Sequence, residues 1–184
     1  MNKYIITGGP YSGKSCVLRL LETQGIQVMH ETARLIIRED QEKKKRDPSY
    51  SHLYPWEDQR IFCRRCHERQ IEREKQLSGE MVILDRSIID NLAYARVAGI
   101  ELDKKIYKDI DNAGYEKKVF FFELLGSYNT DEQRKDSEEQ VREVHKELYN
   151  VYSSLGFKII DIPVFSEDKN RNIIKRTELI LKHI

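Results

Sequence analysis

The sequence predicts an α/β fold in which a mostly parallel β-sheet is covered by helices. Short runs rich in β-branched and aromatic residues alternate with longer segments of helical periodicity along the 184-residue chain. Three of the short runs have continuous apolar cores, at residues 5–6, 81–84 and 119–122, as strands buried on both faces do. This alternation indicates right-handed β-α-β crossovers and therefore parallel strands.

Each element follows from a local pattern. The expected strands span residues 3–7, 26–30, 81–85, 118–123 and 157–162. The expected helices span residues 14–24, 31–42, 56–77, 88–97, 103–112, 131–155 and 167–182. The helix over 131–155 has the clearest signals: an apolar stripe, a capping box of Thr130 with Gln133, and Gly156 as a stop. The polar segment 43–54 is predicted to be a mobile loop, and its basic run 43–46 a solvated helix end.

Composition bounds the class of protein. With 32 Lys+Arg against 31 Asp+Glu, the net charge is +1, which argues against a mainly electrostatic binder of DNA or of a membrane surface. The length suits a single domain over residues 1–184. No apolar stretch approaches the ~18 residues of a membrane span, and the N-terminus lacks a secretory signal. Three cysteines make no disulfide framework, so we expect a cytoplasmic protein, whose oligomeric state the sequence leaves open.

The first predicted strand leads into a phosphate-binding motif. Residues 8–15, GGPYSGKS, match G-x-x-x-x-G-K-[ST] between a strand and an amphipathic helix, which is the context this motif requires. Its glycines let successive N–H groups point inward as an anion nest, and the helix adds its positive dipole end. The residues expected to bind the nucleotide are Gly8, Gly9, Pro10, Tyr11, Ser12, Gly13, Lys14, Ser15 and Cys16.

The motif predicts that the loop binds ATP together with Mg²⁺. Lys14 is expected to bridge the β- and γ-phosphates, and the Ser15 hydroxyl to ligate Mg²⁺. Asp85 ends a buried strand, at the sheet edge where ligands bind, and is a candidate for holding Mg²⁺ or taking a proton. Alternatively, Asp85 is the N-cap of the next helix.

Three further sites are more ambiguous. Glu31 follows the second predicted strand and is a candidate general base toward a substrate hydroxyl, or simply an acid favoured by a helix N-terminus. Arg134, with Lys135, is a candidate for closing over the γ-phosphate, or part of a solvated turn. Asp90 is expected to be structural or a neighbour of Arg86.

Other motifs are interpreted as structural. The run 63–67, CRRCH, matches a haem-attachment pattern, but it lies in the middle of a predicted helix and is interpreted as core packing. His145 lies on the apolar stripe of its helix and is expected to be a partly buried, satisfied histidine.

The motifs in order resemble one family. The loop GGPYSGKS, the segments HETAR, LYPWEDQRIF and LDRSIIDNLAYAR, and the distal TDEQRKD resemble the small P-loop AAA/ATPase family that includes the ribosylnicotinamide-kinase domain of the NadR regulator. The resemblance implies a three-layer, nucleoside-monophosphate-kinase-like fold with five parallel strands in the order 2-3-1-4-5. It also implies a small lid before the long helix, with Arg134 as its phosphate-contacting arginine. Tyr11 departs from the pattern, because small residues are common at its position.

These observations predict an ATP- and Mg²⁺-dependent kinase that phosphorylates a small hydroxyl acceptor, such as a nucleoside or nucleotide. In this hypothesis Lys14, Asp85, Glu31 and Arg134 are catalytic, and Ser15 and Asp85 hold the metal. The alternative is a switch module that binds ATP or GTP, hydrolyses it slowly and recognises a protein or lipid partner. An acceptor that sharply raises turnover would distinguish the kinase from the switch.

Overall fold

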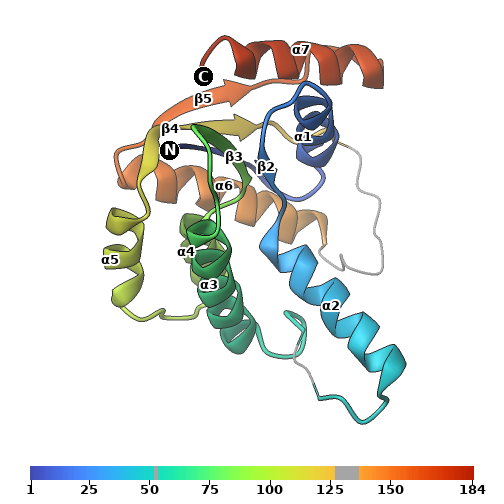
Figure 1. The fold of residues 1–184 in the computed structure, drawn as a ribbon, viewed down its shortest axis with the longest axis vertical. Helices are drawn as coiled ribbons and strands as arrows, with labels where there is room; N and C mark the ends of the chain where they lie inside the picture. Colours follow the sequence, from blue (N-terminus) through green and yellow to red (C-terminus); the bar gives the residue numbers. More distant parts are fainter. Residues whose placement is uncertain (52–53, 127–136) are drawn as a thin grey trace.

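A computed structural model describes residues 1–51, 54–126 and 137–184. Within these residues, five strands form one parallel sheet in the order β2-β3-β1-β4-β5, which confirms the predicted fold class and strand order (Figure 1). The strands are β1 (Asn2–Thr7), β2 (Val28–Met29), β3 (Met81–Asp85), β4 (Tyr115–Phe122) and β5 (Lys158–Ile162).

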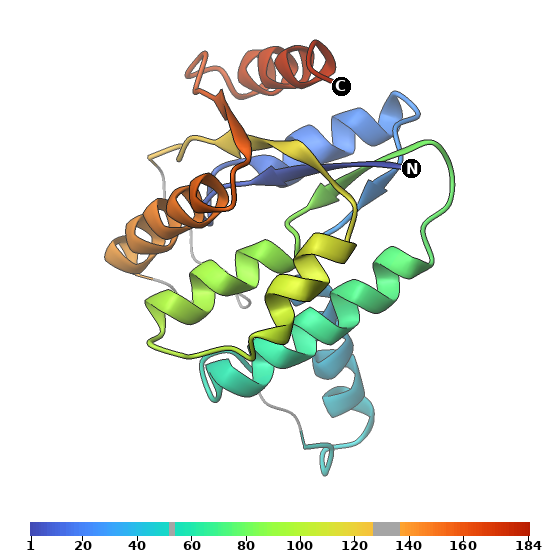
Figure 2. The ribbon, with the colours of Figure 1, turned by 90° about the vertical axis from the view of Figure 1, so that its left-hand side faces the viewer.

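Helices cover both faces of the sheet, giving three layers (Figures 1 and 2). One face carries α1 (Lys14–Thr23) and α7 (Lys169–Leu181), and the other carries α4 (Ile88–Val97), α5 (Lys105–Asn112) and α6 (Glu138–Ser154). Both remaining helices, α2 (Thr32–Arg46) and α3 (Gln59–Lys75), extend beyond the sheet edge beside α4. No helix in the described parts of the chain is long and apolar enough to cross a membrane.

The core lies on both sides of the sheet because the central strands alternate their side chains between two apolar layers. Ile5 of β1 faces the α4–α6 side, and the next residue, Ile6, faces α1 and α7; both are fully buried. A smaller cluster joins α2 to α3 through Ile36, Ile37 and Phe62. This smaller cluster sets the distance between the two helices that will form the walls of a cavity.

Several predicted boundaries were wrong. β2 is only two residues long, shorter than the predicted strand over 26–30, and pairs with β3 alone at the edge of the sheet. α2 continues through Arg46, beyond its predicted end at residue 42, so the basic run 43–46 is an exposed helix end, as expected. α3 begins at Gln59, where the Asp58 side chain accepts a hydrogen bond from the Ile61 amide.

The long helix near the C-terminus also starts later than predicted. α6 begins at Glu138, and its capping box is made by Ser137 and Gln140. The predicted capping pair of Thr130 and Gln133 lies in 127–136, outside the described residues.

Candidate functional site

The loop between β1 and α1 has a backbone that only glycine can supply at its two ends. Gly8 has φ +131°, and a Cβ there would lie 2.6 Å from the carbonyl oxygen of Phe122 in the neighbouring strand β4. Gly13, with φ +83°, is the N-cap residue of α1. Because both positions exclude an L side chain, the loop turns tightly against the sheet and delivers its amides to the helix N-terminus.

Lys14 lies folded back onto this loop. Its side chain is buried, and Nζ donates to the carbonyl oxygens of Gly8 and Gly9, each at 2.9 Å, and to Ser12 Oγ at 3.0 Å. The ammonium group is therefore held above the nest by neutral oxygens that phosphate oxygens can replace. Ser15 and Cys16 follow in the first turn of α1, both half-buried, and the Cys16 amide donates to Gly13 at 3.2 Å.

Two non-glycine residues have left-handed backbones among the described residues, and both lie at this edge of the sheet. Tyr11 in the loop has φ +60°, and Arg86, directly after β3, has φ +70°. Such conformations cost of order 1–3 kcal/mol each and cluster at functional sites. The departure of Tyr11 from the family pattern is thus matched by an unusual backbone.

Asp85 is buried at the end of β3, beside the start of the phosphate loop. It pairs in register with Ile6 of β1, and its Oδ1 has no hydrogen-bond partner among the described residues. Burial and the nearby Glu31 raise the pKa of Asp85 from 3.8 to about 6, against the opposing effect of Lys14. The interpretation of Asp85 as a helix N-cap was wrong, because Ser87 caps α4.

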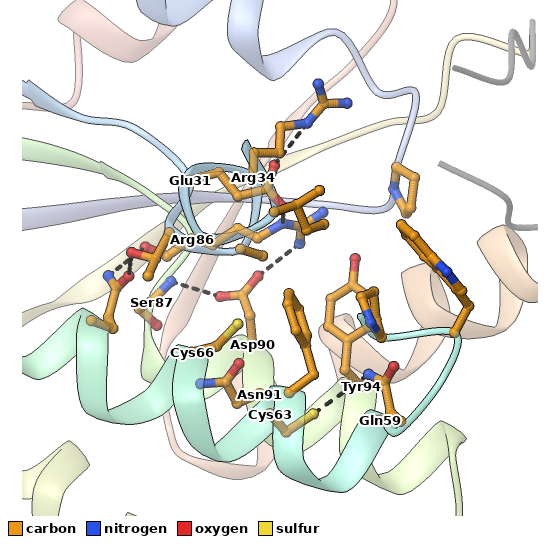
Figure 3. Close-up of a pocket in the computed structure, with 18 of the residues that line it drawn as sticks. Glu31, Arg34, Gln59, Cys63, Cys66, Arg86, Ser87, Asp90, Asn91 and Tyr94 are labelled. Carbon is orange, nitrogen blue, oxygen red and sulfur yellow. Dashed lines mark hydrogen bonds and ion pairs between the residues drawn. The ribbon is translucent and has the colours of Figure 1, made fainter. Parts of the chain in front are cut away.

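Glu31 and Arg86 form an ion pair across the ends of β2 and β3. Arg86 Nε lies 3.1 Å from Glu31 Oε1, and Arg34 Nε lies 3.5 Å from Glu31 Oε2 (Figure 3). Glu31 is also the N-cap residue of α2, but its side chain makes no capping hydrogen bond. The carboxylate is therefore directed toward the arginines, so the reading of Glu31 as a mere helix-end acid does not describe its contacts.

Asp90 is the anchor of this arrangement. It accepts from Arg86 Nη1 at 2.9 Å, from Thr7 Oγ1 at 2.6 Å, from the Ser87 amide at 3.0 Å and from Tyr152 Oη at 2.6 Å. Asp90 is thus structural and a neighbour of Arg86, as expected. Burial alone would lower the pKa of Arg86, but Tyr94, Glu31 and Asp90 raise it well above its usual value, so the guanidinium stays charged.

A cavity of about 290 Å³ opens beside these charges, between α2, α3 and α4 (Figure 3). Pro10 of the phosphate loop lines it, together with Glu31, Arg34 and Arg86. Aromatic and apolar side chains form its other walls: Trp56, Phe62, Tyr94 and Ile37. A largely apolar cavity with a few convergent charges is typical of a small-molecule site.

Two polar residues reach this cavity, and one of them, Asn91, was missed by the sequence analysis. Gln59 of α3 and Asn91 of α4 line it with side-chain amides (Figure 3). Gln70 lines it too, but its amide is engaged by Thr32, Glu74 and the Arg86 carbonyl. The residue types alone did not distinguish Gln59 and Asn91 from Gln70, because the contacts of each amide depend on which face of its helix is turned inward.

The residues 63–67 of α3, which match the haem-attachment pattern, point in two directions. Cys63 and Cys66 are buried and line the cavity, and burial raises the pKa of the Cys63 thiol to about 11. His67 is turned elsewhere, with Nε2 2.8 Å from Asp109 Oδ2 of α5. The two thiols are protonated at neutral pH and pack as small apolar groups.

His145 makes a contact with the phosphate loop that its sequence position did not reveal. From α6, its Nδ1 accepts a hydrogen bond from the Gly9 amide at 3.1 Å, while its ring packs 4.7 Å from Phe121. Because Nδ1 is the acceptor, the proton of the neutral ring is on Nε2. Burial, and then the charge of Lys14, lower the pKa of His145 below 6.5.

We expect the pKa of His145 to lie below 6.5 in the folded protein, and the stability of the fold to decrease as the pH drops below 6.5. The unfolded chain takes up the proton more readily than the folded one, so the folded state loses stability as the pH drops below 6.5. A proton NMR titration measures this, with His145→Gln identifying the resonance. A His145 pKa at or above 6.5 would contradict the contact with Gly9.

Residues 3–169 match a family model described as an AAA domain. The chain belongs to this family. Membership in this P-loop family implies nucleotide binding. No curated protein matches the sequence.

Solved structures of kinases share the fold of this AAA domain. Thymidylate kinase from Ehrlichia chaffeensis has a TM-score of 0.60 at 15% identity, over 100% of this chain and 99% of that one. Deoxyadenosine kinase from M. mycoides has a TM-score of 0.62 at 16% identity, over 98% of this chain and 97% of that one. NadR in complex with NR has a TM-score of 0.61 at 17% identity, over 98% of this chain and 51% of that one. At such identities the likeness establishes a P-loop, kinase-like fold.

Proposed function

We propose that this protein is a Mg²⁺-dependent kinase that transfers the γ-phosphate of ATP to a hydroxyl group of a nucleoside or nucleotide. One observation carries the proposal: Pro10 of the phosphate loop lines the same cavity as Glu31 and Arg86. A triphosphate held by the loop would end beside a cavity that contains a carboxylate, and an acceptor in that cavity would meet both. This juxtaposition favours transfer over simple nucleotide storage.

The triphosphate side uses the loop and two metal-holding candidates. Lys14 would exchange its contacts with Gly8, Gly9 and Ser12 for phosphate oxygens. Ser15 and Asp85 would hold Mg²⁺, and the buried Oδ1 of Asp85, which has no hydrogen-bond partner in the parts of the chain that the structure describes, suits such a ligand. A bound Mg²⁺ would supply charge neutralisation for the phosphates.

On the acceptor side, Glu31 would act as the base. The acceptor oxygen forms a bond to the γ-phosphorus, the bond from that phosphorus to the ADP oxygen breaks, and the hydroxyl proton passes to the Glu31 carboxylate. Arg86, held by Asp90, orients this carboxylate and places a permanent positive charge next to it. Arg134, which lies outside the described residues, is proposed to close over the γ-phosphate.

The walls of the cavity favour a nucleoside-like acceptor. Trp56 lines the cavity and stacks on Tyr54 with ring centroids 4.7 Å apart, and Phe62 and Tyr94 line it as well. Flat apolar surfaces suit a base, and the amides of Gln59 and Asn91 can hydrogen-bond to its edge. The names of the structural neighbours, thymidylate kinase and deoxyadenosine kinase, lend support to the same class.

The test is ADP release from Mg·ATP across a panel of nucleosides and nucleotides, with wild type, Glu31→Gln and Glu42→Gln. Glu42 is an exposed carboxylate on the same helix, so it is the matched control. We expect one acceptor to raise turnover, and Glu31→Gln to lower that turnover by about 10²–10⁴-fold while ATP affinity is unchanged. Nucleotide binding with no acceptor effect would favour the switch module. Full activity of Glu31→Gln would exclude Glu31 as the base.

A further inference from the structure

Arg176, near the C-terminal end of the chain, lies behind the phosphate loop. It belongs to α7, is 1% exposed, and its guanidinium lies 5.1 Å over the ring of Phe122. Nη1 donates to the carbonyl oxygen of Ser12 at 2.6 Å. This hydrogen bond connects the last helix to the middle of the loop, across the whole length of the chain.

The same guanidinium also joins two strand ends. Nε donates to the Pro163 carbonyl oxygen at 2.8 Å, just after β5, and Nη2 donates to that of Glu123 at 3.1 Å, just after β4. Three segments that end at the same edge of the sheet are therefore held by one planar group. Gly13 is close as well, since a Cβ there would lie 3.4 Å from Nη1.

The charge of Arg176 is left without an ion-pair partner among the described residues, since its three hydrogen-bond acceptors are neutral carbonyls. Burial lowers its pKa to about 10, against the opposing effect of the Glu123 carboxylate, so the group is still protonated at neutral pH. A buried cation without a direct ion pair is costly, and carbonyl dipoles together with the more distant charge of Glu123 compensate it only in part. An anion bound in the loop would supply further negative charge.

We propose that Arg176 is a positioning residue of the phosphate site: it holds the Ser12 carbonyl so that the loop stays open as a nest, and it adds positive charge from behind. The inference rests on the proposed function only in that the loop binds a triphosphate, and it needs no acceptor. It assigns α7 a part in nucleotide binding, because loss of the guanidinium frees the loop from the ends of β4 and β5. Within the described part of the chain, Lys14 then lies on the ligand side of the loop and Arg176 on its far side.

The test compares Arg176→Met and Arg176→Lys with wild type and with Ile180→Ala. Ile180 is on the same helix and fully buried in the apolar cluster that includes residues of α1, so it controls for damage to the packing of α7. Calorimetry measures the affinity of the folded protein for ATP and for inorganic tripolyphosphate. The second ligand has no base, so an effect on it reports on the phosphate loop alone.

We expect Arg176→Met to lower the affinity for both ligands by about tenfold or more, and Arg176→Lys to restore part of that loss. Ile180→Ala should lower the melting temperature without changing either affinity. ATP should also raise the melting temperature of Arg176→Met less than that of wild type. Equal affinities for wild type and Arg176→Met would overturn the inference and leave the proposed kinase intact. If Arg176→Met does not fold, wild-type affinity in Arg176→Lys together with an unchanged thermal shift would overturn it. A wild type that binds neither ligand would overturn both proposals.

Discussion

Lys14→Ala is expected to lower the affinity for ATP by about 100-fold or more. The side chain is 4% exposed and its ammonium group is the one cation that the loop itself supplies to the phosphates. Alanine removes that charge and the hydrogen bonds that Nζ donates to the carbonyl oxygens of Gly8 and Gly9. Both consequences act at the loop, so the loss should appear in binding as well as in turnover.

Titration calorimetry with Mg·ATP measures this loss directly. Lys146→Ala is the matched control, since Lys146 is an exposed lysine on α6, next to His145. It should bind as wild type does. Circular dichroism of Lys14→Ala verifies that the fold is retained. Unchanged ATP affinity in a folded Lys14→Ala protein would refute a phosphate site at this loop.

Asp85→Asn should lower Mg²⁺-dependent turnover by about 100-fold or more, and the variant should keep the fold. An amide is a poor ligand for Mg²⁺ in place of a carboxylate, whereas its size fits the same space. The fold should tolerate the change because Asp85 caps no helix and its Oδ1 has no partner among the described residues. Turnover against Mg²⁺ concentration is the measurement, and Asp111→Asn, an exposed aspartate just after Ile110 in α5, is the control.

The same variant makes a prediction about pH. The pKa of Asp85 is raised from 3.8 to about 6, so the folded chain holds this proton more tightly than the unfolded chain does. Stability from this group is therefore present at low pH and is lost as the pH rises from 3.8 to about 6. Chemical denaturation without Mg²⁺ should show this decline as the difference in stability between wild type and Asp85→Asn, because His145 acts in the opposite direction in both proteins. Turnover that persists in Asp85→Asn, with an unaltered pH dependence of stability, would remove Asp85 from the site.

The parts of the site that the sequence predicted are local in the chain. The loop from Gly8 to Ser15 carries its own glycine pattern, and Asp85 was found because a buried strand ends there. Glu31 was found in the same way, although its pairing with Arg86 needed the strand order, which places β2 beside β3.

The missed contacts join distant segments. His145 reaches Gly9 over 136 positions and Arg176 reaches Ser12 over 164, so neither leaves a periodic signal near the loop. In the sequence Arg176 looks like one more charge on an amphipathic helix. Only the packing of α7 against α1 shows that its side chain is directed inward, and residue spacing carries little information on that packing.

The central claim is phosphate transfer to an acceptor in the cavity beside Pro10, Glu31 and Arg86. The most direct measurement follows the γ-phosphate itself, with isotope-labelled ATP and Mg²⁺, in the presence of each nucleoside and nucleotide in turn. We predict that the label appears on one acceptor, with one ADP formed for each phosphate transferred, and that Glu31→Gln prevents it. Label that is released only as inorganic phosphate, or retained on ATP with every acceptor, would contradict the kinase and leave a nucleotide-controlled switch.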